Sequence, residues 1–407
     1  MTKLKTILFL SYYGHQKRFF SNLAIHIPKH IRAFSLNIYQ LSLFPRFIIR
    51  FIFNLIFGAF HYDENTINPI IEFSYKRFKA RHPKFPNKIL VIIKAFQIIR
   101  AKTYYQFFRT WLGKQEVDLL VVWNGLRLPV AAAVSAAKDN GIKLLFCENG
   151  YLPKTVTMDT KGVNAFNSLI GKTAEFYQKV PVEEGKLEDL FKTTLIPRQL
   201  NQKNISAKYR RKCIEEEIKL PQEFIFLPLQ VHDDSQILIH SPNFQDMYSL
   251  VNFCASEIRT YNKKYQSNLK LVIKEHPSDY GRIDYEPLKK QYSETIFTQI
   301  ADTKELIQKC KVVITVNSTV GIEGLLYLKP VITMGNAFYN VPGLVYHCEV
   351  ADDFCKLLFS ALNKPIDQKL IKQFLYYLRY DYLLEIDRKN LATANYEKVV
   401  ARIINSL

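Results

Sequence analysis

The sequence predicts an α/β fold made of two domains with a cleft between them. At 407 residues the chain is too long for one comfortable hydrophobic core. Short, strongly apolar segments alternate with helical patterns in two stretches of the chain, which is typical of parallel sheets covered by helices. Polar residues directly follow four of these segments. Because ligands of open α/β sheets bind beyond the carboxyl ends of the strands, we expect the four polar clusters to converge on one ligand, as in an enzyme.

The first half of the chain begins with a predicted buried strand over 6–10. Polar residues follow at 11–15, too soon for the apolar core of a signal peptide. From Val117 the pattern becomes α/β. It predicts a strand over 118–123, an alanine-rich helix over 129–138, a turn at Asn140 and Gly141, and a strand over 142–147.

The second half repeats the α/β pattern after a polar, charged segment over 201–222, where we place the domain boundary. The predicted domains are residues 1–205, which we expect to face a membrane and an acceptor substrate, and residues 206–380, which we expect to bind a donor substrate. A C-terminal helical segment, 381–407, is expected to pack back on the first domain. Strands are predicted near 224–229, 270–274, 312–316 and 330–334, with helices near 245–262, 302–309 and 320–327.

The charge of the chain indicates an anionic partner. Lys and Arg number 56 against 37 Asp and Glu, a net charge of +19. No nucleic-acid-binding module accompanies this charge, and the basic residues sit beside apolar and aromatic stretches, which favours an anionic membrane surface over nucleic acid. Six scattered cysteines indicate a reduced, cytoplasmic chain.

The most apolar stretch, residues 41–60, is interrupted by Pro45, Arg46, Arg50 and Asn54, so a membrane-spanning helix is not expected. On a helix the two arginines and Asn54 form one polar stripe. The helix either lies in a membrane interface or packs in a core with its arginines in solvent. A second basic and aromatic stretch, from Lys88 to Trp111, leaves the same two alternatives open.

The most informative polar cluster follows the strand 311–316. Asn317, Ser318 and Thr319 are suited to close around a phosphate at a helix start, and Glu323 lies one turn further, where it could accept from ribose hydroxyls. A plain helix cap is the alternative. The chain lacks GxxxxGK[ST] and GxGxxG sequences, so a nucleotide-sugar fits better than ATP or a dinucleotide.

Two further strand ends carry candidate donor-binding residues. His276 follows an apolar strand and precedes Pro277, so its imidazole is expected to project into the cleft beside Lys274 and to donate to a phosphate oxygen. A structural histidine is the alternative. Gln230 follows the strand over 224–229 in the same way.

Three carboxylates are candidates for catalysis at an anomeric carbon: Glu148 after one strand, and Asp233 and Asp234 after another. An exposed turn is the alternative for the two aspartates. The sequence has no Asp-x-Asp and no His/Cys cluster at metal-ligand spacing, so neither a metal nor another cofactor is implied.

An ordered set of motifs over residues 117–345 resembles the bacterial capsule polysaccharide biosynthesis family. The first hundred residues match it only loosely. The motifs are Trp123-Asn124-Gly125, Glu148-Asn149-Gly150-Tyr151-Leu152-Pro153, Asp159 to Asn164, Leu229 to Ile237, Lys274-Glu275-His276-Pro277, and Asn317 to Gly321 with Gly335.

The resemblance implies a GT-B-like fold and retaining transfer of β-Kdo from CMP-Kdo to a lipid-linked acceptor, a phosphatidylglycerol-type lipid or its Kdo-bearing product. It implies a protein peripheral on the inner membrane, with a capsule assembly or export complex as partner. Asp234 would be the nucleophile, with Asp233 leaving the assignment uncertain by one residue, and Glu148 the acid/base. His276, Ser318 and Thr319 would bind the CMP phosphate, and Asn124, Asn149, Gly150 and Asn164 would line the acceptor side.

Two other functions remain open at this point. A transferase of the same fold could use another CMP-sugar, such as CMP-sialic acid, because a His-Pro element and a Ser/Thr phosphate turn would serve any of them. A non-catalytic protein that binds glycolipid for export would retain the same residues without turnover.

Overall fold

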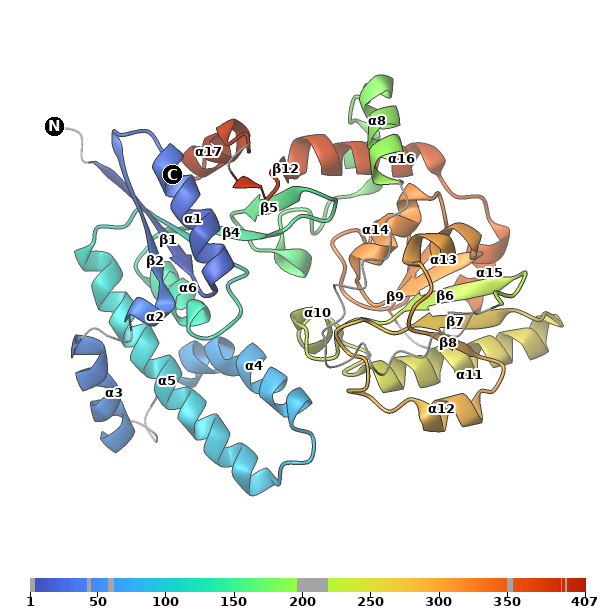
Figure 1. The fold of residues 1–407 in the computed structure, drawn as a ribbon, viewed down its shortest axis with the longest axis horizontal. Helices are drawn as coiled ribbons and strands as arrows, with labels where there is room; N and C mark the ends of the chain where they lie inside the picture. The colour runs from blue at the N-terminus through green and yellow to red at the C-terminus, as the bar shows by residue number, and fades with distance from the viewer. Residues whose placement is uncertain are drawn as a thin grey trace. The chain divides into compact units, whose positions relative to one another are not determined.

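A computed structural model describes residues 4–41, 45–57, 62–195, 219–349, 354–388, 390–391 and 394–407. The chain forms two compact units, each with its own sheet (Figure 1). Unit 1 comprises Met1–Ser168 and Tyr382–Leu407, and unit 2 comprises Leu169–Asp381.

The sheet of unit 1 has six described strands in the order β12-β5-β4-β3-β1-β2. The four strands from β4 to β2 are parallel, and β5 and β12 run antiparallel to their neighbours. Because β1 leads to β2 on one side and β3 follows on the other, the order reverses between β1 and β3. The bounds are β1 Lys5–Ser11, β2 Ile31–Asn37, β3 Leu119–Trp123, β4 Lys143–Asn149, β5 Thr155–Asp159 and β12 Leu384–Glu385.

Helices cover both faces of this sheet, so the side chains along each strand point alternately into two cores. Leu8 and Leu120 pack in the core that contains α5 and α6, while Phe9 and Val121 pack in the core that contains α1 and α17. The helices are α1 Gly14–His26, α2 Ile38–Leu41, α3 Pro45–Phe57, α4 Glu64–Arg81, α5 Asn87–Lys114, α6 Val130–Asp139, the short 3₁₀ turn Asn164–Phe166, and α17 Glu397–Ile404.

The described strands of unit 2 form a wholly parallel sheet in the order β11-β10-β9-β6-β7-β8. The order reverses between β6 and β9, where ligands of such sheets bind. The strands are β6 Phe224–Pro228, β7 Lys270–Lys274, β8 Ile296–Thr298, β9 Val312–Thr315, β10 Val331–Thr333 and β11 Tyr346–His347. The helices are α7 Ala174–Gln178, α8 Glu184–Thr194, α10 Ser235–Leu238, α11 Met247–Tyr265, α12 Glu286–Gln291, α13 Thr303–Lys309, α14 Thr319–Leu326, α15 Phe354–Asn363 and α16 Gln368–Tyr377, followed by a π-helical turn Leu378–Tyr382.

The predicted α/β class with two Rossmann-like units is confirmed, and these are the two units that a GT-B-like fold contains. The unit boundary differs from the predicted one at 205/206, because α7 and α8 pack on α16 in unit 2. Gln373 donates to the Gln178 carbonyl at 2.8 Å, and the Tyr376 hydroxyl donates to Glu183 at 3.1 Å. Most of the predicted boundary segment, 201–218, lies outside the described residues.

The C-terminal segment returns to unit 1. β12 pairs with β5, and the Tyr382 hydroxyl donates to the buried carboxylate of Asp159 at 3.0 Å. Arg402 on α17 donates to the Met158 carbonyl at 3.0 Å. This return places the residues after β12 next to the start of β5, and Arg388 next to Asn149 at the end of β4.

Candidate functional site

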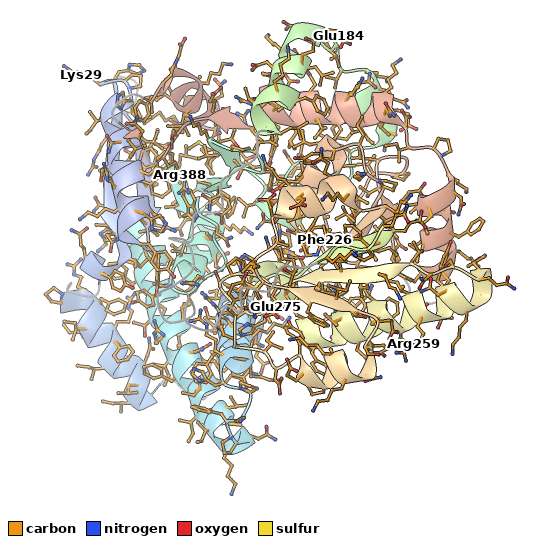
Figure 2. All side chains as sticks on the ribbon, turned by 45° about the vertical axis from the view of Figure 1, so that its right-hand side comes forward. Lys29, Glu184, Phe226, Arg259, Glu275 and Arg388 are labelled. Carbon is orange, nitrogen blue, oxygen red and sulfur yellow. The ribbon has the colours of Figure 1, made fainter. Side chains whose placement is uncertain are left out.

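Three neighbouring strand ends of unit 2 carry the predicted donor-binding residues. β6, which contains Phe226, leads to Gln230; β7 ends before Glu275, with His276 next along the chain; and β9 leads to Asn317 (Figure 2). These strands lie side by side, with the β6/β9 reversal among them. The structure therefore brings the three predicted clusters of unit 2 to one edge of one sheet.

Gln230 and Asn317 are buried and bound to each other across the β6/β9 reversal. The Gln230 Nε2 donates to Asn317 Oδ1 at 3.0 Å, and the Asn317 backbone N–H donates to Gln230 Oε1 at 3.3 Å. The Asn317 amide also donates to the carbonyls of Gln236, His240 and Asn336. Since these amide groups are engaged by the protein, the pair fixes the strand ends.

The two adjacent aspartates have opposite environments. Asp233 is 1% exposed, and the Arg282 Nη1 lies 3.7 Å from its Oδ1. Asp234 is exposed and is the N-cap of α10, with Oδ1 accepting from the Gln236 N–H at 2.9 Å. A nucleophile must reach the substrate, so Asp234 fits that role and Asp233 fits a structural ion pair.

His276 is half-buried and close enough to Asp234 for that carboxylate to act on it. Its Nδ1 accepts from the Ser278 N–H at 3.1 Å, which leaves the Nε2 as the donor of the neutral ring. Burial lowers the pKa of His276, against the opposing effects of Asp279 and Asp234. A neutral imidazole with one outward donor suits a phosphate oxygen. Pro277 follows, half-buried, where the chain leaves the strand.

Lys274 lies at the last position of β7 and is almost fully buried. Its Nζ donates to Thr303 Oγ1 at 2.6 Å. Burial lowers the pKa of Lys274, while the carboxylates of Asp302 and Glu323 raise it. Lys274 therefore connects β7 to α13 through Thr303, and the charges of Asp302 and then Glu323 favour its cationic form.

Ser318 and Thr319 begin α14 at the end of β9. Ser318 is the N-cap, its Oγ accepting from the Val320 N–H at 3.2 Å, and Thr319 is exposed. The Tyr339 hydroxyl donates to the Ser318 carbonyl at 2.5 Å, and a Cβ on Gly321 would lie 2.5 Å from that hydroxyl. Glycine at 321 therefore allows Tyr339 to hold the cap in place.

In unit 1 the predicted carboxylate Glu148 is held at the end of β4 by donors from two strands. Trp123 Nε1 donates to Oε1 at 3.0 Å, Asn124 Nδ2 donates to Oε2 at 3.0 Å, and the Asn149 N–H donates to Oε1 at 2.8 Å. Asn124 adopts a left-handed backbone conformation with φ of 62°, which aims its amide at the carboxylate. Asn124, Glu148 and Asn149 therefore lie together.

Arg388, from the segment after β12, completes this cluster and was not predicted. Its guanidinium lies 4.4 Å from the centroid of the Trp123 ring and donates to Asn149 Oδ1 (Figure 2 labels Arg388). Burial lowers the pKa of Arg388, while Glu148 raises it. Arg388 also acts on His15. Burial and, to a smaller extent, the charge of Arg388 lower the pKa of His15. Only the predicted return of the C-terminal segment hinted at such a residue.

The two remaining acceptor-side residues shape the loop after β4. The Gly150 N–H donates to the Thr155 carbonyl at 2.9 Å, and a Cβ at 150 would collide with Thr155. The Asn164 N–H donates to the Tyr151 hydroxyl at 3.2 Å. Gly150 therefore permits the tight turn, and Asn164, which follows β5, holds Tyr151 of this loop in place.

A family model described as capsule polysaccharide biosynthesis protein matches residues 177–382, half of the chain. The capsule polysaccharide export protein KpsS of Escherichia coli is 30% identical over 329 residues, covering 68% of this chain and 82% of that protein. Protein FixF of Sinorhizobium fredii is 30% identical, covering 76% of this chain and 72% of that protein.

Among solved structures, the β-Kdo 2,4 transferase of Thermosulfurimonas dismutans KpsC is 20% identical with a TM-score of 0.44, covering 71% of this chain and 87% of that one. A UDP-GlcNAc 2-epimerase of Methanocaldococcus jannaschii is 13% identical with a TM-score of 0.36, covering 93% of this chain and 100% of that one. The family match and the identity to KpsS carry the assignment. The chain belongs to the capsule polysaccharide biosynthesis family.

Proposed function

We propose that the chain is a retaining glycosyltransferase that moves β-Kdo from CMP-Kdo to a lipid-linked acceptor in capsular polysaccharide biosynthesis. The observation that carries the proposal is the exposed carboxylate of Asp234 at the carboxyl end of β6, with His276 within electrostatic reach. Family membership supports the pathway, and the motif resemblance supplies the donor.

In the proposed reaction Asp234 attacks the anomeric carbon of Kdo. The bond between that carbon and the phosphate oxygen breaks, its electron pair leaves with CMP, and a glycosyl ester forms. His276 Nε2–H and the Thr319 hydroxyl donate to the departing phosphate. An acceptor hydroxyl then attacks the same carbon and gives its proton to a base, the role that the motif resemblance assigns to Glu148, and the Asp234 carboxylate is released. Two displacements retain the configuration.

The acceptor in this proposal is a phosphatidylglycerol-type lipid or its Kdo-bearing product, so the protein works at the inner membrane as a peripheral protein. No helix among the described residues is long and apolar enough to cross a membrane. A capsule assembly or export complex is the proposed protein partner.

The experiment is incubation of the purified chain with CMP-Kdo, generated in situ, and a lipid-linked acceptor, with the acceptor mass as readout. We expect a gain of one Kdo residue, with the β configuration seen by NMR. Parallel incubation with CMP-sialic acid tests the other donor. Binding of CMP without turnover of either sugar would overturn the proposal in favour of a non-catalytic export role, the role that the name of the KpsS relative describes.

A further inference from the structure

Helix α3 turns apolar side chains outward. Ile49 is 67% exposed, Phe53 is 61% exposed and Ile56 is 65% exposed. By contrast Asn54 is 1% exposed and donates to Thr103 Oγ1 and Gln106 Oε1 of α5, both at 3.1 Å. Along the predicted polar stripe, Asn54 contacts α5 while Arg46, two turns earlier, is exposed. A helix on a surface that faces only water would expose its polar side chains and bury its apolar ones.

The neighbouring helix α5 extends the apolar surface. Val91 and Ile92 on its first turns are each 67% exposed, and Phe96 is 45% exposed and contacts the ring of Phe51 on α3. Large apolar side chains from two packed helices thus lie in water in this structure. Exposed apolar surface of this kind marks an interaction site rather than ordinary surface.

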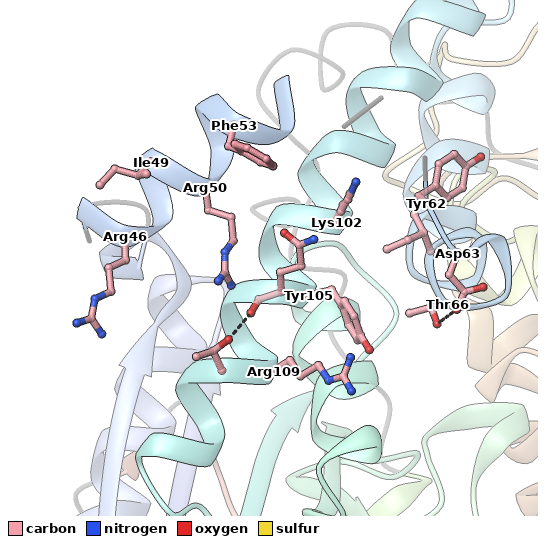
Figure 3. A pocket seen from close by; sticks show the side chains of 13 residues that line it. Arg46, Ile49, Arg50, Phe53, Tyr62, Asp63, Thr66, Lys102, Tyr105 and Arg109 are labelled. Carbon is pink, nitrogen blue, oxygen red and sulfur yellow. Dashed lines mark hydrogen bonds between the residues drawn. The ribbon is translucent and has the colours of Figure 1, made fainter. Parts of the chain in front are cut away.

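A cavity of about 900 Å³ lies between α3, α5 and the start of α4 (Figure 3). Its walls follow helical spacing, with Arg46 and Arg50 on α3, Lys102 and Arg109 on α5, and Asp63 and Thr66 at the start of α4. Figure 3 shows Arg50 extending from α3 toward α5, and Arg109 beside Tyr105.

The charge of this cavity is strongly positive. Four cations, Arg46, Arg50, Lys102 and Arg109, line it with a single carboxylate, Asp63. That carboxylate already accepts from the Thr66 hydroxyl at 2.6 Å and the Asn65 N–H at 3.0 Å as the cap of α4. The cavity therefore complements an anion, and its α3 wall is continuous with the exposed apolar face.

We propose that this cavity binds the phosphate headgroup of an anionic phospholipid while the exposed faces of α3 and α5 enter the surrounding bilayer. A phospholipid is the ligand class that joins a phosphate to long apolar chains, which matches a cationic cavity bordered by apolar helix faces. The inference deepens the proposed peripheral location, on which it rests, but does not depend on the transfer reaction.

The first experiment measures binding of the full chain to vesicles of phosphatidylcholine with and without phosphatidylglycerol, by co-sedimentation. We expect Arg50→Glu with Arg109→Glu to weaken binding to the anionic vesicles by at least about thirtyfold. The matched control is Lys263→Glu with Lys364→Glu, two exposed lysines of unit 2 whose reversal lowers the net charge equally. Its binding is expected to change by less than about threefold.

The second experiment tests entry of the apolar face. Ile52→Trp places a reporter on α3, where Ile52 is 50% exposed. Its fluorescence is expected to be quenched by phosphatidylglycerol vesicles that carry brominated chains. At high salt the charge attraction is screened, and the binding that the unchanged chain retains depends on apolar burial. Ile52→Asp with Ile56→Asp is expected to abolish this remaining binding.

Equal losses in the two charge-reversed pairs would overturn the cavity assignment in favour of diffuse attraction. Absence of quenching would overturn the apolar entry. Competition by glycerol phosphate at the affinity of the lipid would show a soluble anion site instead. Turnover of a soluble acceptor is measured in parallel. If the unchanged chain turns over the soluble acceptor but does not bind the vesicles, this inference fails while the proposed function stands.

Discussion

Both units place polar residues at the carboxyl ends of parallel strands, but they complete their sites differently. In unit 2 the residues come from strand ends that the sequence displays as contiguous motifs, and the buried ones bind one another: Gln230 pairs with Asn317. In unit 1 the residues converge on one carboxylate, Glu148, and the last of them, Arg388, arrives from the far end of the chain. The difference separates residues that build the edge of one sheet from residues that distant parts of the chain gather around one carboxylate.

The largest effect is expected from the two aspartates of unit 2. Asp234→Asn removes the proposed nucleophile and should lower turnover by about three orders of magnitude or more, with CMP binding retained. Asp233→Asn weakens the buried pair with Arg282 and should cost about 1–3 kcal/mol of unfolding free energy. Kinetics with CMP-Kdo, CMP calorimetry and urea unfolding measure the three quantities. Full turnover in Asp234→Asn would remove this residue from the mechanism.

The next effect is expected in unit 1. Arg388→Ala should lower turnover by about a hundredfold, because Trp123 and Asn149 lose the cation that orders them around Glu148. CMP affinity should stay unchanged, since the proposed phosphate donors lie in unit 2. Arg388→Lys should recover little, because an ammonium does not stack on the indole as a guanidinium does.

The control for Arg388 is Lys398→Ala, on the exposed side of α17 in the same C-terminal segment. Its turnover should match that of the unchanged chain. If Arg388→Ala lost stability and CMP binding together, the residue would serve folding and not the arrangement of Glu148.

The sequence predicted most of the strands and the motif residues because both depend on neighbours along the chain. The apolar runs at 224–229 and 312–316 became β6 and β9, and the residues after them lie at one sheet edge. The burial of individual side chains was not predicted, because nothing in the sequence Asp233-Asp234 shows which of the two carboxylates lies beside Arg282. Arg388 was missed because it reaches Glu148 only through the pairing of β12 with β5. The unit boundary was misplaced because α7 and α8 pack on α16, about two hundred residues further along the chain.

A smaller effect is expected from glycines within unit 2. Gly321→Ala should cost about 1–3 kcal/mol, because its Cβ would lie 2.5 Å from the Tyr339 hydroxyl that holds the start of α14. Gly185→Ala, in α8, meets no atom within 4 Å and should stabilise the chain by about 0.5–1 kcal/mol. Urea unfolding compares them. Similar stabilities would show that Tyr339 moves without cost.

The smallest effect concerns pH and again compares the units. Burial lowers the pKa of His276 below its ordinary value of 6.5, so the unfolded chain binds a proton there more readily than the folded one. Stability carried by the neutral ring is fully present above about pH 6.5 and is lost progressively as pH falls from that value through the lower pKa of the folded state. His276→Asn should therefore lose less stability on acidification from about pH 7.5 to 5.5 than the unchanged chain.

A bound phosphate has the opposite effect on His276, because the anion favours the imidazolium. CMP binding should therefore take up protons below neutral pH, seen in calorimetry as a dependence of the binding enthalpy on the buffer. His276→Asn should abolish this uptake, and uptake that persists in the variant would place the phosphate away from His276. The same residue would then be a structural histidine after β7, and the edge of unit 2 would bind its donor through Ser318 and Thr319 alone.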